Sequence, residues 1–216
     1  MSDDPRPVVV DRRVTPRGEL VLRRTGDAFE VISNGTFLMD TRDGRSERAL
    51  VAAALEGMAG ARVLLGGLGV GFSLDEALRQ DVTEVVVVEV EPAVLDWAAG
   101  PLRGAVEHGL DDPRVQPVVG DIREVMARLD ASFDAVCLDV DNGPGWLVHD
   151  ANASLYGAAG LEALARLLRP GGRLSVWSAQ DDAEFEARLR SIFADVAVIR
   201  IPVPRGPDDV IYVASA

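Results

Sequence analysis

The sequence predicts an α/β protein with a mostly parallel seven-stranded sheet that ends in a C-terminal antiparallel hairpin. From residue 46 onward, short apolar runs alternate with segments of helical pattern, as in a sheet whose strands are joined by crossover helices. The runs at 63–65, 85–88 and 135–138 are apolar throughout, which is typical of parallel strands buried on both faces. The last two apolar runs are joined by too few residues for a crossover helix, so they must pair antiparallel.

Residues 1–45 predict a tail and a small antiparallel β unit. Residues 1 to about 12 are polar and rich in proline and are expected to be irregular. Asn34-Gly35 lies between two alternating runs, which is a strong short-range signal for a hairpin. Strands are expected at residues 19–24, 29–33 and 36–40. A unit this small buries little apolar surface, so it is expected to pack on the main domain or on another subunit.

Residues 46–216 are expected to form one main domain. Its first helix is expected to begin with Ser46 as the N-cap, and Pro92 marks the first turn of another helix. Helices are expected at residues 46–55, 73–80, 92–98, 121–129, 158–168 and 182–193. The first strand is expected to begin at Val63, and later strands are expected at residues 85–89, 116–119, 135–138, 174–177, 196–203 and 210–214.

The composition argues against several classes of function. A formal net charge of −13 argues against nucleic-acid binding, which needs clustered basic residues, although it is compatible with a cationic substrate or with solubility alone. The lone Cys137 lies in an apolar run and is expected to be a buried thiol. His108 and His149 lack partners at ligand spacing, so no metal site is expected. With no membrane-length apolar run and no signal sequence, we expect a cytoplasmic protein.

One apolar run ends in the spacing Gly67-x-Gly69-x-Gly71, which predicts a strand that passes through a tight turn into a helix. About twenty residues on, Glu89 ends the next apolar run, where an acidic side chain can bind both hydroxyls of a ribose. A dinucleotide site needs a glycine where this chain has Phe72. The spacing therefore favours a Rossmann-like fold of the S-adenosylmethionine type, with a dinucleotide site or a structural turn as alternatives.

Four acidic residues follow predicted strands and are expected to meet at the carboxyl edge of the sheet. Glu89 suits the ribose hydroxyls. Asp121 could accept a hydrogen bond from an adenine amino group, or could serve only as a helix N-cap. Asp139 and Asp141 suit the binding and deprotonation of an ammonium group before its nitrogen attacks a sulfonium carbon. Local hydrogen bonding within a turn is the alternative for these two residues.

Three aromatic residues could line an acceptor pocket. Tyr156 and Trp146 lie in the segment after the fourth strand of the main domain, and Trp177 ends the fifth. Aromatic walls suit a cation or an apolar chain, and packing in the core is the alternative for each residue.

In combination, these motifs resemble the spermidine synthase (polyamine aminopropyltransferase) family, whose fold is that of class I S-adenosylmethionine-dependent methyltransferases. The resemblance covers roughly residues 34–178, and the chain is identified as a short, divergent member. The similar segments are residues 34–55, the glycine turn with Leu74-Asp75-Glu76-Ala77-Leu78, Val88-Glu89-Val90-Glu91, 112–121, 139–145, Leu155-Tyr156 and 168–172.

The resemblance implies a homodimer that transfers an aminopropyl group from decarboxylated S-adenosylmethionine to a polyamine and releases methylthioadenosine. Asp139 would be the base, with Asp141 beside it. We expect Asp141, together with the aromatic residues Tyr156 and Trp177 described above, to bind the acceptor. The residues implied in cofactor binding are Gly67, Leu68, Gly69, Gly71, Glu89, Val90, Asp121, Ile122 and Asp139.

The departures from the family pattern fall on the amine side of the site. Val70 stands where the family has an aspartate in the glycine turn, and Trp177 stands where it has a glutamine. Ser46-Glu47-Arg48 replaces Tyr-His-Glu, and the D-S-x-D-P motif is shortened to Asp139-Val140-Asp141-Asn142. Two alternatives follow: a methyltransferase that uses S-adenosylmethionine itself, and a nucleoside- or polyamine-binding module without turnover.

Overall fold

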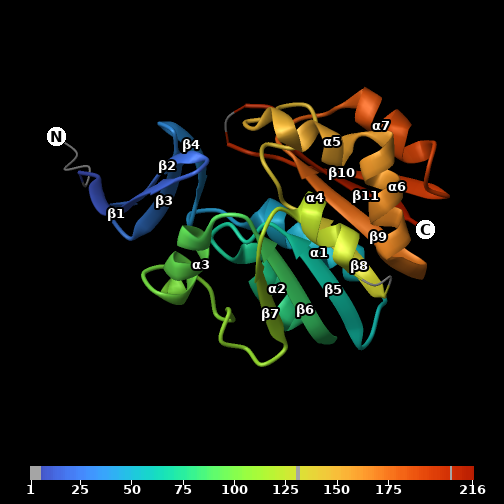
Figure 1. Ribbon diagram of the computed structural model, residues 1–216, viewed down its shortest axis with the longest axis horizontal. Coiled ribbons are helices and arrows are strands. Elements are labelled where there is room, and N and C mark those ends of the chain that lie inside the picture. The colour runs from blue at the N-terminus through green and yellow to red at the C-terminus, as the bar shows by residue number, and fades with distance from the viewer. Residues whose placement is uncertain (1–5, 130–131, 205) are drawn as a thin grey trace.

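The computed structural model describes residues 6–129, 132–204 and 206–216. The described residues form two sheets, a four-stranded N-terminal sheet and a seven-stranded main sheet. The N-terminal sheet lies beside the main body, with helix α3 (Pro92–Ala99) next to it (Figure 1). In the described part, no helix is long and apolar enough to cross a membrane.

The N-terminal sheet is antiparallel throughout, in the order β1-β2-β3-β4. Its strands are β1 (Val8–Thr15), β2 (Gly18–Thr25), β3 (Ala28–Ser33) and β4 (Thr36–Asp40). Asn34 and Gly35 both have positive φ, so the predicted hairpin turn is confirmed. The prediction of an irregular segment up to residue 12 is wrong for residues 8–12, which pair with β2, whereas residues 1–5 lie outside the described part. Most side chains of β1 are exposed, so the strand lacked a buried face that its pattern could reveal.

The main sheet has the strand order β10-β11-β9-β8-β5-β6-β7. Its strands are β5 (Ala61–Gly66), β6 (Val82–Glu89), β7 (Val115–Val119), β8 (Phe133–Leu138), β9 (Leu168–Ser178), β10 (Asp195–Ile201) and β11 (Asp209–Ser215). The first five strands in chain order are parallel, and β11 is antiparallel to both β9 and β10. The predicted α/β class, parallel sheet and C-terminal hairpin are confirmed.

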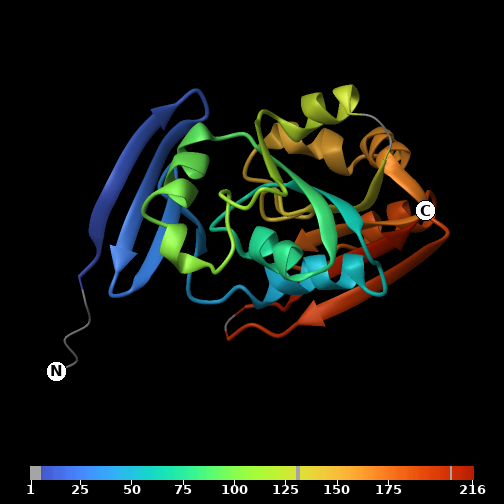
Figure 2. The same cartoon turned by 90° about the horizontal axis from the view of Figure 1, so that it is seen from below.

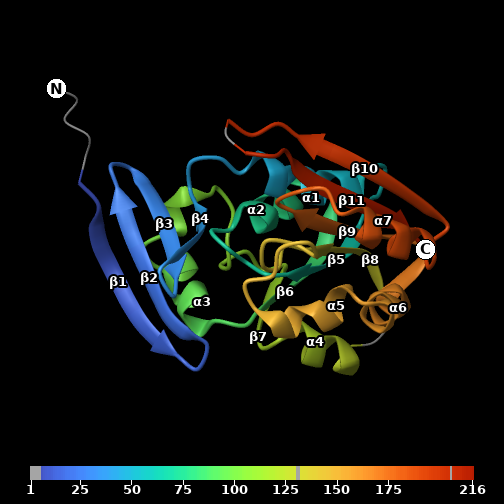
Figure 3. The same ribbon diagram turned by 90° about the horizontal axis from the view of Figure 1, so that it is seen from above.

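Helices cover both faces of the main sheet (Figures 2 and 3). Besides α3, they are α1 (Arg45–Leu55), α2 (Phe72–Arg79), α4 (Ile122–Val125), α5 (Ala153–Tyr156), α6 (Ala158–Leu167) and α7 (Ala183–Arg190). Within β5, Val63 and Leu65 belong to the apolar cluster of α1, α2 and α3, whereas Leu64 belongs to that of α6 and α7. Because alternate side chains of one strand enter two cores, the strand is apolar throughout.

The N-terminal sheet shares the first of these cores. Leu22 and Val31 belong to the same apolar cluster as Val94 of α3. The indole nitrogen of Trp97 in α3 donates a hydrogen bond to Asp11 of β1 at 2.9 Å. These contacts attach the N-terminal sheet to α3 of the main domain.

Three predicted helix ends are wrong. Helix α1 begins at Arg45 after Gly44, and the side chain of Ser46, the predicted N-cap, instead bonds to Glu47. Helix α4 ends at Val125 and continues as a 3-10 turn to Arg128, and α7 ends at Arg190.

Candidate functional site

The glycine turn lies where the connections of the main sheet change direction. Strands β5 and β8 are neighbours, and the chain leaves β5 toward β6 on one side before it returns to β8 on the other. Ligands of open parallel sheets bind at this point, outside the carboxyl ends of the strands. Gly67 has φ +93°, and a Cβ atom there would collide with the carbonyl oxygen of Asp139. Only glycine therefore lets the turn after β5 lie against the end of β8.

Glu89 joins the end of β6 to the glycine turn. Its side chain is buried, and its Oε2 accepts a hydrogen bond from the backbone N–H of Leu68 at 3.0 Å. The other oxygen, Oε1, accepts from the N–H of Glu91 at 2.9 Å. Burial raises the pKa of Glu89, and these backbone hydrogen bonds oppose the shift. The carboxylate is thus held at the pocket edge, and each oxygen has a second lone pair for a ligand hydroxyl.

A first pocket, which we call the nucleoside pocket, brings together most of the predicted cofactor residues. They are Gly67, Gly69, Glu89, Val90, Asp121, Ile122 and Asp139, together with Asp141 from the predicted amine side. Leu68 instead lines the neighbouring pocket described below, and Gly71 is not among the residues that line either pocket.

The N-terminal sheet supplies a wall of the nucleoside pocket that was not predicted. Arg17, Leu20, Val31, Ser33, Leu38 and Met39 line it. The Arg17 guanidinium lies 3.9 Å from Asp121 and 3.8 Å from Glu91, across the pocket edge. The position of these residues depends on how the N-terminal sheet packs on the main domain, and no local sequence pattern indicates that packing.

Asp121 combines the two roles that its sequence context left open. Its side chain caps α4 by accepting a hydrogen bond from the N–H of Arg123 at 2.9 Å, and it also lines the nucleoside pocket. The Arg123 side chain binds the same carboxylate and lowers its pKa. Any hydrogen bond to an adenine amino group would therefore use a lone pair that the cap and this arginine leave.

Asp139 lies at the boundary of the nucleoside pocket and a second pocket. Its Oδ2 accepts a hydrogen bond from the hydroxyl of Ser73 at 3.3 Å. Burial raises the pKa of Asp139 to about 7, and the nearby carboxylate of Glu47 contributes to this rise. A carboxylate with a pKa near neutrality is suited to accept and release a proton.

The second pocket, which we call the amine pocket, is lined by acidic and aromatic side chains. Besides Asp139, it is bordered by Glu47 at the start of α1, Asp209 at the start of β11 and Trp177 of β9. The described residues that line it include six acidic side chains but no Arg, Lys or His: Asp40, Asp43, Glu47, Asp139, Asp141 and Asp209. From the sequence, the Glu47 segment stood out only as a departure from the family motif, and no pattern singled out Asp209.

Asp141 organises the loop that follows β8. Its φ is +63°, and its carboxylate accepts hydrogen bonds from the backbone N–H of Val148 at 2.6 Å and of His149 at 3.0 Å. It also accepts one from the side-chain amide of Asn152 at 3.0 Å. Asp141 lines both pockets, but these donors already occupy much of its hydrogen-bonding capacity.

The predicted aromatic residues lie in different surroundings. Trp177 and Trp146 line the amine pocket. Tyr156 is not among the residues that line either pocket. Its ring packs edge-on against Phe185, and its hydroxyl donates a hydrogen bond to the carbonyl of Val140 at 2.6 Å. The structure therefore places Tyr156 beneath the strand end that carries the site.

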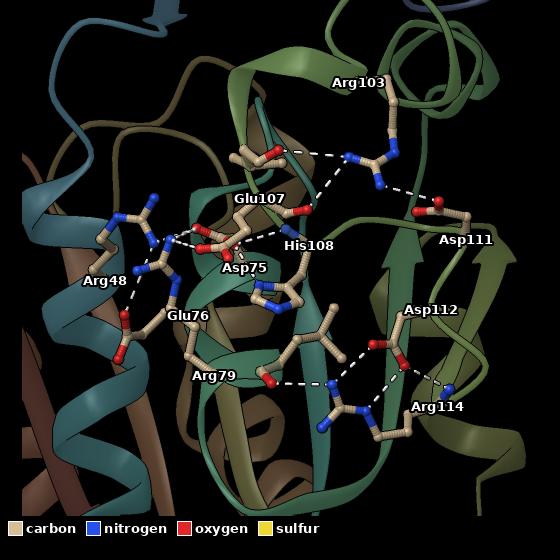
Figure 4. A network of polar contacts seen from close by, with 12 residues as sticks. Arg48, Asp75, Glu76, Arg79, Arg103, Glu107, His108, Asp111, Asp112 and Arg114 are labelled. Carbon is tan, nitrogen blue, oxygen red and sulfur yellow. Dashed lines mark hydrogen bonds and ion pairs between the residues drawn. The ribbon is translucent and has the colours of Figure 1, made fainter.

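A polar network surrounds α2, the helix that follows the glycine turn (Figure 4). At its centre, Asp75 of α2 is fully buried and accepts hydrogen bonds from Arg48 of α1 at 2.6 Å and from the backbone N–H of His108 at 2.9 Å. Arg79 lies 3.3 Å from the same carboxylate. Burial by itself raises the pKa of Asp75, but these donors outweigh it and hold the pKa at about 2. The network joins α1 and α2 to the segment before β7.

Two further observations concern metal-ligating and thiol side chains. Within residues 6–129, 132–204 and 206–216, no group of three or more His, Cys, Asp or Glu side chains is arranged to hold a metal ion. Cys137 is buried in β8, and burial raises its thiol pKa to about 12, so the thiol stays protonated at neutral pH.

Comparison with known proteins gives a consistent result. Residues 49–215 match the spermine/spermidine synthase domain family. The chain is 34% identical over 163 residues to a polyamine aminopropyltransferase of Mycobacterium tuberculosis, a match that covers 73% of this chain and 30% of that protein. It is also 34% identical over 174 residues to polyamine aminopropyltransferase 2 of Streptomyces coelicolor, covering 76% of this chain and 30% of that protein. The chain thus matches less than a third of the length of these two relatives.

Solved structures share the fold. A spermidine synthase in complex with the transition-state analogue AdoDATO superimposes with a TM-score of 0.81 at 20% identity, covering 96% of this chain and 73% of the other. Spermidine synthase from Thermotoga maritima superimposes with a TM-score of 0.78 at 21% identity, covering 96% and 72%.

Proposed function

Because this chain belongs to the spermine/spermidine synthase family, we propose that it transfers an aminopropyl group from decarboxylated S-adenosylmethionine to an amine nitrogen of a polyamine. The observation that carries this proposal is the junction of two pockets at Asp139. One pocket has the features of a nucleoside site, and the other is acidic. A cofactor with a cationic tail and an amine acceptor would meet at that junction.

The nucleoside pocket fits the adenosyl part of the cofactor. Gly67 and Gly69 hold the turn at positive φ, and Glu89 presents buried carboxylate oxygens to ribose hydroxyls. Asp121 and Ile122 line the same pocket at the end of β7, where an adenine ring would be placed.

The amine pocket favours the decarboxylated cofactor over S-adenosylmethionine. The intact methionyl tail carries a carboxylate, which Glu47, Asp139 and Asp209 would repel. An aminopropyl tail carries only an ammonium group, which these side chains would attract. The charge of the pocket therefore supports aminopropyl transfer over methyl transfer.

Asp139 would perform the proton transfer. Decarboxylated S-adenosylmethionine supplies a methylene carbon activated by the sulfonium group. As a carboxylate, Asp139 accepts a proton from the acceptor ammonium, and Ser73 holds the accepting side chain in place. The amine nitrogen then forms the new C–N bond while the C–S bond breaks, the electron pair stays on sulfur, and methylthioadenosine is released.

The test is to incubate the protein with decarboxylated S-adenosylmethionine and a series of amines and to measure methylthioadenosine by chromatography. We expect its release in the presence of a polyamine and its loss in Asp139→Asn. A parallel reaction with S-adenosylmethionine should yield no S-adenosylhomocysteine. Release of S-adenosylhomocysteine, or binding of nucleosides without any turnover, would overturn the proposal.

We also propose that the protein acts as a cytoplasmic homodimer. The edge strand β1 exposes several apolar side chains, among them Val8, Val9 and Val14, which a second copy could cover. The free, buried thiol of Cys137 is compatible with a reducing compartment. Sedimentation analysis should show a dimer that Val14→Asp weakens, and a monomer at all concentrations would contradict this assignment.

A further inference from the structure

We propose that Glu47 and Asp209 together bind one primary ammonium group of a linear aliphatic amine, next to the nitrogen that Asp139 deprotonates. The inference rests on the proposed function and adds two residues to its site. They come from opposite ends of the main domain, the first turn of α1 and the first residue of β11.

Two serine hydroxyls connect these carboxylates. The Oγ of Ser46 donates to Oε2 of Glu47 at 3.0 Å and is within hydrogen-bonding reach of the Asp209 carboxylate. The Oγ of Ser73 lies 3.4 Å from the Glu47 carbonyl oxygen and 3.3 Å from Oδ2 of Asp139. Each hydroxyl carries only one proton, so it can donate to one acceptor at a time. The three carboxylates are thus close together but share few donors.

Among the described residues, Glu47, Asp139 and Asp209 lack the arginine partners that other acidic side chains have. Asp43, at the edge of the same pocket, binds Arg45 at 2.7 Å, and the buried Asp75 binds Arg48 at 2.6 Å. By contrast, the ion pairs among the described residues include none to Glu47, Asp139 or Asp209, and the described residues that line the pocket contribute no cation. Burial raises the pKa of both Glu47 and Asp209. Repulsion from Asp209 adds to the rise at Glu47, and repulsion from Asp43 and Asp208 adds to the rise at Asp209. An ammonium ion would supply both the missing positive charge and up to three N–H donors for these carboxylates.

The surroundings of the group also suit an alkylammonium ligand. Val70 and Leu68 border the same pocket, so the glycine turn presents apolar side chains there and the carboxylates come from α1 and β11. Trp177 adds an aromatic wall beside Asp209. An aliphatic chain with a cationic end matches this combination of apolar, aromatic and acidic walls.

Two molecules could supply the ammonium group. One is the aminopropyl tail of decarboxylated S-adenosylmethionine, and the other is the second amine of a diamine acceptor. Both present the same chemistry, a primary ammonium on a short alkyl chain. Methylthioadenosine lacks the tail, and butylamine lacks the second amine, so each serves as a matched probe.

The experiment compares Glu47→Gln and Asp209→Asn with two control variants, Glu56→Gln at the other end of α1 and the exposed Asp195→Asn at the start of β10. Calorimetry would measure the affinity for decarboxylated S-adenosylmethionine and for methylthioadenosine. With methylthioadenosine present, it would also measure the affinity for 1,4-diaminobutane and for butylamine. The thermal midpoint of each variant shows whether that variant is folded. We expect no variant to have a lower midpoint than the wild type, because each substitution removes a negative charge either from a group of mutually repelling carboxylates or from the surface.

If the cofactor tail is the ligand, the Glu47 and Asp209 variants should bind decarboxylated S-adenosylmethionine about tenfold or more weakly, with methylthioadenosine unchanged. If the acceptor is the ligand, the same loss should affect 1,4-diaminobutane and spare butylamine. The inference is overturned if all four affinities stay within about twofold of the wild type, or if the controls lose as much. Methylthioadenosine release by the wild type tests the proposed function separately, so failure of one is distinguishable from failure of the other.

Discussion

The carboxylate of Glu89 and the backbone N–H of Leu68 are joined by a buried hydrogen bond of 3.0 Å. This bond ties the end of β6 to the turn that follows β5, and Glu89 also accepts from the N–H of Glu91. The residue that would bind the ribose therefore also fixes the shape of the turn beside it. Changes at Glu89 should alter both the chemistry and the geometry of the nucleoside pocket.

Glu89→Ala should weaken methylthioadenosine binding by about tenfold to a hundredfold, because it removes charge-assisted hydrogen bonds worth about 1.5–3 kcal/mol. Calorimetry would measure the change. Glu124→Gln, on the short helix α4, is a control that should bind normally. Normal affinity in Glu89→Ala would remove this residue from the ribose site.

Asp139 should make the reaction depend on pH. Because burial raises its pKa to about 7, the carboxylate form increases as pH rises through neutrality. We expect kcat/KM to rise about tenfold per pH unit below that value and to level off above it. Asp139→Asn should lose this dependence and about 10²–10⁴-fold of kcat, with methylthioadenosine affinity unchanged. A wild-type profile that is flat from about pH 5 to about pH 8 would exclude Asp139 as the base, because a group with a pKa near neutrality titrates within that range.

Two parts of the site were predictable because they depend on local pattern and strand order. The glycine turn and Glu89 end adjacent parallel strands, so apolar runs and spacing were enough to bring them together. Asp139 follows β8, the other neighbour of β5, and was predictable for the same reason.

The remaining parts depend on packing between elements that are distant in sequence. Arg17 and Met39 reach the nucleoside pocket only because the N-terminal sheet packs on α3. Glu47 lies in a segment whose sequence differs from the family motif, yet α1 places Glu47 in the same pocket as Asp139. Tyr156 had the residue type of a pocket wall, but its position beneath Val140 follows from the packing of α5 and α7.

The substitution Tyr156→Phe distinguishes a structural role of Tyr156 from a role in substrate binding. It removes the hydrogen bond from the Tyr156 hydroxyl to the Val140 carbonyl but keeps the ring against Phe185. We expect a loss of about 1 kcal/mol in the free energy of unfolding, measured in urea, and an acceptor KM close to that of the wild type. A large rise in acceptor KM with unchanged stability would instead place the hydroxyl at the substrate.

Asp75 should control the stability of the protein in acid. Its pKa is about 2 in the folded state and 3.8 as the ordinary value, so its ion pairs contribute fully above about pH 4 and are lost as pH falls toward 2. Asp75→Asn would remove the buried partner of Arg48 and Arg79, which keep Glu76 and Glu107, and should reduce the free energy of unfolding at pH 7 by about 2–3 kcal/mol. The variant should also be less sensitive to acid than the wild type, because the titrating carboxyl is gone.

The control variant Asp111→Asn, which alters only an exposed ion pair with Arg103, should change neither the stability at pH 7 nor the sensitivity to acid. Equal acid sensitivity in the wild type and Asp75→Asn would show that other carboxylates, and not this network, limit stability at low pH.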